Sequence, residues 1–374
     1  MGWIVGIEKV ETSFAGTSTS VLLTGVGASG YDGYLVPFVT FSYNGVSTSQ
    51  VTPLFVQVYF SGTPGNVSVN FERSEASGTA YVTCYVIEVD TNEVSVQSSN
   101  FSMNGATSDT SAITEVDTSK AFHIQYHRFS NTGTEYMFQA LVRTYFSSTT
   151  QLTHDRANGS GIIHGQYWVI EDLGNNFDVQ HADPDVINPA TSGEDTISSV
   201  DMAKSFVVAS HKNYYGARST YYAAVSVWLK TATVVRAEQG ANSGYPANSI
   251  VRAQVITLTD TDAYVDRGSQ VYNNGTATDA DPLSQSFDLD YSIAWIPTLS
   301  SMQWVDTHDR TDDSFFLAEL TSDSEITTKR YQTNTGAVVK WEAVQFELPP
   351  PPPPPPPETV SFSGGIKLSN VIIK

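Results

Sequence analysis

The feature that most constrains the fold is an internal repeat with a spacing of 84 residues. The segment 116–122, VDTSKAF, matches the segment 200–206, VDMAKSF, and the stretch after each contains an equivalent histidine, His127 and His211. Self-similarity at a fixed period means that one supersecondary unit is copied along the chain. The sequence therefore predicts tandem units of moderate size rather than one large domain.

We place four units at residues 1–90, 91–172, 173–260 and 261–348, each closing with an arginine, a turn and an apolar strand. The residues that we predict to be equivalent structural positions are Asp117, Lys120 and Phe122, then Asp201, Lys204 and Phe206, and the arginines Arg73, Arg156, Arg236 and Arg330. We expect the aspartates to cap turns, the lysines to be solvated or paired, and the phenylalanines to point inward. We expect the arginines to bond loop carbonyls or a glutamate of the closing strand. The first unit lacks the Val-Asp-Lys-Phe segment, and residues 35–38 (LVPF) are its nearest counterpart.

The composition indicates an all-β protein. The chain is 40% hydrophobic and 11% aromatic, and its apolar runs of five to eight residues alternate with Ser, Thr, Asn and Gln. Turn pairs such as Asn44-Gly45 and Asn104-Gly105 separate these runs. Several short strands per unit with frequent turns predict tandem antiparallel β-sandwich units with little helix.

The order of elements also carries a resemblance. An opening Val-Gln strand, a Val-Asp-x-x-Lys-x-Phe segment, a later arginine and a closing Val-Ile-Glu strand resemble a β-sandwich repeat found in tandem in phage virion proteins. The general form of the unit is similar to that of H-type lectin domains. The resemblance covers nearly all of residues 1–348 and implies a sandwich fold and a role in a virion.

Charge and cysteine content limit the classes of partner that we expect for this protein. The net charge of −20 repels phosphate backbones and anionic membrane surfaces, so we expect no nucleic-acid partner and no membrane insertion. The one cysteine, Cys84, lies in an apolar run and is predicted to be a buried thiol. The first residues lack a basic region and an apolar core, so we expect no signal peptide there, and no apolar stretch is long enough to predict a transmembrane helix.

A run of nine prolines, 349–357, separates the acidic body from a last segment, 358–374. Such a run forms a stiff polyproline II spacer of about 28 Å. The segment beyond it is too short to fold alone and too apolar to be an ordinary tail, which favours a strand that docks on a neighbouring subunit. The predicted docking residues are Val360, Phe362, Ile366, Leu368, Val371, Ile372 and Ile373. A strand that folds back onto its own chain and a disordered tail are the alternatives.

Candidate chemistry is sparse. Acidic loop pairs such as 183–185, 260–262 and 279–281, with Asp309 and 312–313, could bind Ca²⁺, but none has the spacing of a calcium-binding loop, and we predict no cofactor. His123 and His127 lie too far apart on one strand to share a metal. No Gly-x-Ser-x-Gly elbow supports a catalytic triad. Exposed tyrosines at 214–215 and 221–222 could stack on host surface glycans.

We therefore predict a non-enzymatic structural subunit of a phage virion, a decoration, fibre or tail- or neck-attached protein. It would assemble with itself or other virion proteins through its C-terminal strand and reside in the particle after assembly in the host cytoplasm. The alternatives are a glycan-binding adhesin and, less favoured, a polysaccharide-degrading enzyme.

Overall fold

The computed structural model describes residues 3–28, 30, 33–46, 50–131, 133, 135–214, 223–239, 248–273, 275–298, 303–304, 315–331 and 336–346. The polyproline run and all seven predicted docking residues of the C-terminal segment lie outside this part of the chain.

The described chain is almost entirely β-strand, and its strands fall into four successive sets that lie within the four predicted ranges. We call these sets units 1 to 4. Unit 1 contains β1 (Ile4–Phe14), β2 (Ser18–Leu22), β3 (Leu35–Asn44), β4 (Gln57–Thr63), β5 (Asn66–Glu72) and β6 (Thr79–Val89). Unit 2 contains β7 (Val94–Asn104), β8 (Ser108–Ala112), β9 (Ala121–Ser130), β10 (Arg143–Ser148), β11 (Gln151–Asp155) and β12 (Ile162–Asp172).

Units 3 and 4 repeat the order. Unit 3 contains β13 (Phe177–Ala182), β14 (Ser192–Thr196), β15 (Ser205–Asn213), β16 (Val225–Thr231), β17 (Val234–Gln239) and β18 (Ser249–Leu258). Unit 4 contains β19 (Tyr264–Tyr272), β20 (Thr278–Pro282), β21 (Ser292–Trp295), β22 (Gln303–Trp304), β23 (Leu317–Ser322), β24 (Glu325–Lys329) and β25 (Ala337–Gln345). The short helical elements are η1 (Thr52–Leu54), α1 (Met137–Ala140) and η3 (Leu289–Tyr291).

Every unit has the same topology, two antiparallel sheets that form a sandwich. The first, third and last strands of a unit make one sheet with the last strand in the middle, as in β1-β6-β3 and β7-β12-β9. The second, fourth and fifth make the other with the fifth in the middle, as in β2-β5-β4. Unit 4 has one additional strand, β22, which pairs with β25 and is left out of this strand count. The all-β, antiparallel fold class predicted from the sequence is confirmed.

Strand register identifies equivalent positions in units of different sequence. Phe122 lies opposite Ile170 and Phe206 opposite Ile256, and in unit 1 the residue opposite Ile87 is Val36. Val36 is therefore the structural counterpart of the two phenylalanines, while Phe38 lies opposite Tyr85, two residues further along. The counterpart of the two phenylalanines thus lies within the LVPF segment, at Val36.

One position on each central strand contacts the neighbouring unit. Its occupants, each directly before the closing apolar pair, are Tyr85, Trp168, Gln254 and Glu342. Gln254 accepts a hydrogen bond from the backbone N–H of His123 in unit 2 (2.9 Å) and donates one to its carbonyl (2.8 Å), and Glu342 accepts one from Val207 in unit 3 (2.8 Å).

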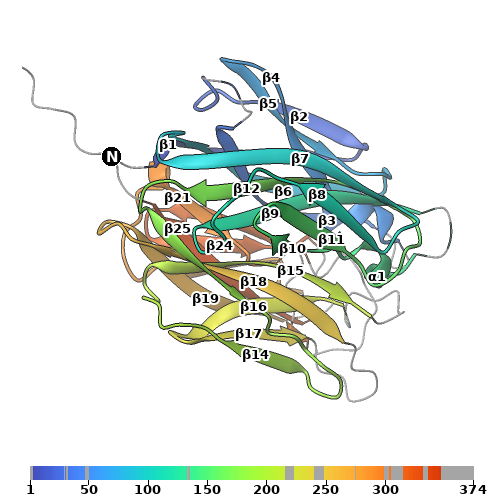
Figure 1. Cartoon of the computed structure of the whole chain (residues 1–374). Helices are drawn as coiled ribbons and strands as arrows, with labels where there is room; N and C mark the ends of the chain where they lie inside the picture. The colour runs from blue at the N-terminus through green and yellow to red at the C-terminus, as the bar shows by residue number, and fades with distance from the viewer. Residues whose placement is uncertain are drawn as a thin grey trace, which may run out of the picture.

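In unit 1 the residue at this position contacts unit 4. The Tyr85 hydroxyl of unit 1 accepts a hydrogen bond from Leu320 of unit 4 (2.9 Å) and also bonds the backbone of Ala294. Trp168 of unit 2 packs edge-on against Phe60 of unit 1. Unit 2 thus contacts unit 1, unit 3 contacts unit 2, unit 4 contacts unit 3, and unit 1 contacts unit 4. The four units therefore form a closed ring. Figure 1 shows the blue strands β2, β4 and β5 of unit 1 at the top and β14, β16 and β17 of unit 3 at the bottom, with β9 and β12 between them.

Aromatic side chains fill the centre of the ring. Phe38 packs edge-on against Trp295 at 5.2 Å between ring centroids, and Phe206 contacts both Phe38 and Phe122. At one end of this core Trp3 contacts Phe177 and Phe346, each at 5.3 Å. Most of unit 3 keeps a separate apolar core between its own sheets, around Val207, Val227 and Val255. The body is therefore one molecule with a shared centre rather than independent domains on a string.

Candidate functional site: the grooves between units

The repeated Asp and Lys residues hold turns. Asp117 accepts a hydrogen bond from the backbone N–H of Ser119 (2.9 Å), and Asp201 accepts one from Ala203 (2.9 Å). Lys120 donates to the carbonyl of Gly174 (3.2 Å), and Lys204 donates to the carbonyl of Asp260 (2.5 Å). Each lysine thus ties its turn to the segment that follows the last strand of its unit. Phe122 and Phe206 are fully buried in the centre of the ring.

Three of the four arginines bond loop carbonyls from buried positions. Arg73 donates to the carbonyls of residues 14–16, Ser77 and Gly78, and Arg330 donates to those of Asn273 and Thr276. Arg156 donates to six carbonyls, those of Met103, Ala106, Gln139, Ser160, Gly159 and Gly161. Burial lowers the pKa of Arg156 to about 10, so its guanidinium remains charged at neutral pH.

Arg236 does not occupy the equivalent position in unit 3. The backbone N–H groups of Arg73, Arg156 and Arg330 donate to Thr17, Thr107 and Ala277, and the residue of unit 3 that makes this bond, to Thr191, is Gln239. Gln239 is buried, whereas Arg236 lies three residues earlier and forms ion pairs with Glu194 (2.9 Å) and Glu238 (3.5 Å). The sequence prediction of Arg236 is therefore wrong at this position, because a glutamine replaces the arginine of the other three units.

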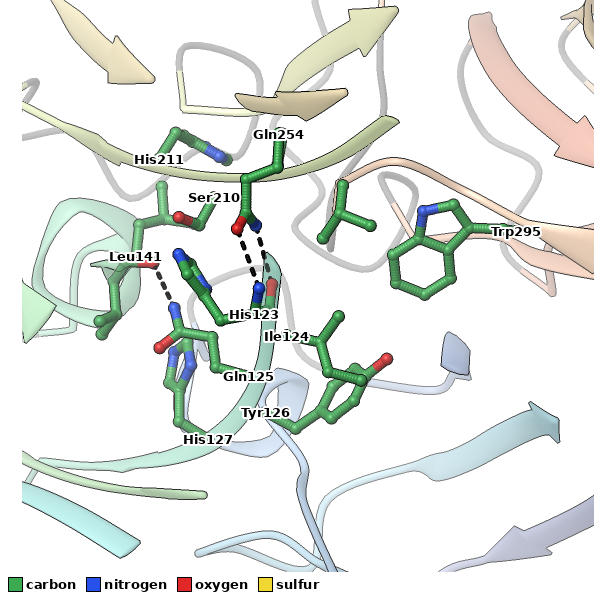
Figure 2. Close-up of a pocket in the computed structure, with 13 residues that line it drawn as sticks. His123, Ile124, Gln125, Tyr126, His127, Leu141, Ser210, His211, Gln254 and Trp295 are labelled. Carbon is green, nitrogen blue, oxygen red and sulfur yellow. Dashed lines mark hydrogen bonds between the residues drawn. The ribbon is translucent and has the colours of Figure 1, made fainter. Parts of the chain in front are cut away.

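His123 and the two repeat-equivalent histidines, His127 and His211, line a small cavity of about 30 Å³ between units 2 and 3 (Figure 2). His127 Nε2 bonds the carbonyl of Ala140 (2.7 Å), and the equivalent His211 Nε2 bonds that of Ala223 (2.8 Å). Burial lowers the pKa of each to about 4, so both rings are neutral N–H donors at pH 7. Figure 2 also shows Gln254 reaching across the junction to the main chain of His123.

Larger hollows lie at three junctions between units, and strand register shows that they occupy equivalent positions. They measure about 1010 Å³ between units 1 and 2, about 490 Å³ between units 2 and 3, and about 200 Å³ between units 3 and 4. Each is lined by a half-buried aromatic residue at the same position on the fourth strand of the earlier unit: Tyr59, Tyr145 and Trp228. Unit 4 has Glu319 at this position, paired with Lys9 of unit 1 (3.5 Å) and with Lys329.

The three aromatic rings differ in what covers them. The guanidinium groups of Arg143 and Arg252 lie 4.7 Å and 5.4 Å from the ring centre of Tyr145. Lys340 and Arg236 lie 4.8 Å and 5.8 Å from that of Trp228. The residue of unit 2 equivalent to Arg252 and Lys340 is the uncharged Gln166, and within the described ranges no cation lies over the ring of Tyr59.

Aspartates of the acidic loop pairs form ion pairs and hydrogen bonds with other residues of the same chain. Asp183 pairs with Arg252 (2.7 Å), Asp185 accepts from the backbone of Val251 (2.8 Å), and Asp281 accepts from the indole of Trp341 (2.9 Å). Among the residues that the structure describes, no group of three or more His, Cys, Asp or Glu side chains is arranged to hold a metal ion. Asp309 and residues 312–313 lie outside the described part.

Of the exposed tyrosines, Tyr214 is 52% exposed, with Lys212 5.5 Å from its ring centre, and residues 215, 221 and 222 lie outside the described part. No helix among the described residues is long and apolar enough to cross a membrane. A comparison with models of protein families matches none of them, and a comparison with curated proteins finds no similar sequence.

Sequence reasoning did not find the grooves. Each one combines strands from two units, so no local pattern marks it. The one available signal was the aromatic residue that directly precedes Phe60, Phe146 and Leu229 in the fourth strands of units 1 to 3.

Proposed function

We propose that this chain is a non-enzymatic structural subunit of a phage virion whose ring-shaped body attaches to a neighbouring subunit or to the particle through the C-terminal segment 358–374. The observation that carries the proposal is the closure of the ring. Because each unit completes its contacts with two others of the same chain, the body needs no partner to fill its core, and assembly can rest on a separate attachment element.

The distribution of charge also supports attachment of the C-terminal segment to the body of another subunit. Lys367 and Lys374 against Glu358 give segment 358–374 a side-chain charge of +1, which leaves −21 on the rest of the chain. Attraction between the tail of one subunit and the body of another therefore has a favourable sign. The last described residue is Phe346, whose buried ring contacts Trp3 at 5.3 Å between ring centroids.

The test is removal of residues 349–374. The truncated body should keep the far-UV spectrum and thermal transition of the full chain but lose self-association and incorporation into particles. A variant with Val360→Asp and Phe362→Asp should behave like the truncation, whereas Glu358→Gln should assemble normally. Undiminished incorporation of the truncated chain contradicts the proposal.

A glycan-binding adhesin is the second candidate. The observation that favours it is the open groove between units 1 and 2, where the ring of Tyr59 is free of covering cations among the described residues. The two candidates are separable because the truncated body would still bind glycans if the adhesin hypothesis holds.

A further inference from the structure

The groove between units 1 and 2 differs from its three ring equivalents in a way that suggests a ligand. Two of the equivalents have their aromatic ring covered by two cations each, and the third has an ion-paired glutamate in place of the ring. Only the Tyr59 groove, among the described junctions, combines an uncovered ring with a large open volume of about 1010 Å³. This volume is at the upper end of what small-molecule sites enclose, about 300–1,000 Å³.

The polar lining of this groove is rich in planar hydrogen-bonding groups. Side chains from both units contribute, and the most informative are Glu72, Asp109, Arg128, His164 and Gln166. Arg128 of unit 2 forms an ion pair with Glu72 of unit 1 across the floor of the groove. The Nε of Arg128 is buried and has no hydrogen-bond partner within the described residues. A buried guanidinium N–H without an acceptor is costly. The Nε itself is covered, but 27% of the Arg128 side chain is exposed, and Arg128 lines the groove.

The balance of charge selects the class of ligand. The groove holds two carboxylates, Glu72 and Asp109, against one guanidinium, and burial together with the nearby Arg128 lowers the pKa of His164, which keeps that imidazole neutral at pH 7. With −20 on the whole chain, an anionic ligand would meet repulsion at long and at short range. An uncharged ligand with many hydroxyl groups matches a lining of mixed donors and acceptors.

We propose that the groove between units 1 and 2 binds an uncharged oligosaccharide, with one sugar ring stacked on Tyr59. The C–H face of the sugar covers the half-buried aromatic ring, which removes apolar surface of both partners from water. The hydroxyls at the ring edge bond the planar side chains of Glu72, Arg128 and Gln166. This function is additional to attachment through the C-terminal segment and does not depend on it.

The experiment uses the full-length chain on an array of neutral oligosaccharides built from hexose and N-acetylhexosamine units, with sialylated and sulfated counterparts. We expect binding to neutral members. Calorimetry with the best of them should show at least about tenfold weaker binding for Tyr59→Ala, equivalent to about 1.4 kcal/mol. Tyr59→Phe should keep most of the affinity.

The matched control is Tyr145→Ala, which removes the equivalent ring from the cation-covered groove and should leave the affinity unchanged. Asn100→Trp adds a large side chain at an exposed residue of the groove lining and should block binding even if Tyr59→Ala fails to fold. Absence of binding to every neutral member at millimolar concentration, equal binding by Tyr59→Ala and wild type, or preference for the anionic counterparts would each overturn the proposal. None of these outcomes bears on attachment by residues 358–374.

Discussion

The guanidinium of Arg156 takes the place of water for the carbonyl groups that surround it. Six backbone oxygens of unit 2 receive its hydrogen bonds, and the side chain is almost fully buried. Buried acceptors that lose their donor pay their full desolvation cost, about 1–3 kcal/mol each before relaxation. The arginine therefore stabilises the closing turn of its unit through satisfied carbonyls rather than through an ion pair.

This assignment predicts unequal effects for two arginines that look equivalent in sequence. Arg156→Met should lower the free energy of unfolding by about 3–5 kcal/mol because several buried carbonyls lose their donor. Arg236→Met should lower it by about 1 kcal/mol or less because this side chain makes partly exposed ion pairs. Urea unfolding of both variants at pH 7 is the measurement, and similar losses would show that the carbonyl cage is not what Arg156 provides.

At the scale of strands, four different residue types occupy the same junction position, and each contacts the neighbouring unit in its own way. Gln254 and Glu342 face the backbone N–H groups of His123 and Val207, whose equivalent in unit 1 is Pro37. Proline has no N–H to donate. The unit that faces it has Trp168 at the junction position, which packs on Phe60 and leaves no acceptor unsatisfied.

The junction between units 3 and 4 contains an ionisable group, so its strength depends on pH. Burial raises the pKa of Glu342 to about 7, and Arg267 partly opposes this shift. Between its ordinary value of 4.5 and about 7 the folded state binds more protons than the unfolded state. Stability contributed at this site therefore falls as pH rises through that window.

Exchanging the two junction residues tests this account. Glu342→Gln keeps an acceptor for Val207, removes the titration, and should gain stability relative to wild type between pH 5 and pH 8. Gln254→Glu places a carboxylate against the carbonyl of His123 and should destabilise the fold by about 2–4 kcal/mol at pH 8 and by less at pH 5. Unfolding free energies at four pH values check both, and a pH-independent difference for either variant contradicts the raised pKa.

The elements also show what the sequence could reveal. Strand type, antiparallel pairing and the match between units 2 and 3 follow from alternation and from the VDxxKxF segment, because these are local patterns. Ring closure does not follow from local patterns. Its contacts are made by residues at one structural position whose side chains have nothing in common, namely Tyr85, Trp168, Gln254 and Glu342. Gln239 was missed for the same reason, and the Tyr59 groove was missed because its walls come from two units.

At the scale of the whole molecule, a closed ring of units does not require the chain termini to lie at one particular junction. Trp3 and Phe346 lie against each other with ring centres 5.3 Å apart, so the two ends of the described body meet. The segment between units 3 and 4 is a polar turn at Asp260, where Thr261 and Asp262 are exposed. Cutting an exposed turn and joining adjacent ends preserves the contacts within a fold.

A circular permutant that begins at Asp262, joins residue 346 to residue 3 through a short Gly-Ser linker and ends at Thr261 should therefore fold. We expect a monomer with a single thermal transition within a few degrees of that of the chain truncated after residue 346.

The contrasting protein is a chain that ends at Thr261 without unit 4. It would expose Phe38 and Phe206 where Trp295 and Phe346 now pack, and leave the N–H of Val207 without Glu342. That chain should aggregate or melt far lower, because exposing a large apolar face costs about 25 cal/mol per Å². Size-exclusion chromatography and differential scanning calorimetry compare the three proteins. A stable three-unit chain, or a permutant that does not fold, would contradict the closed ring.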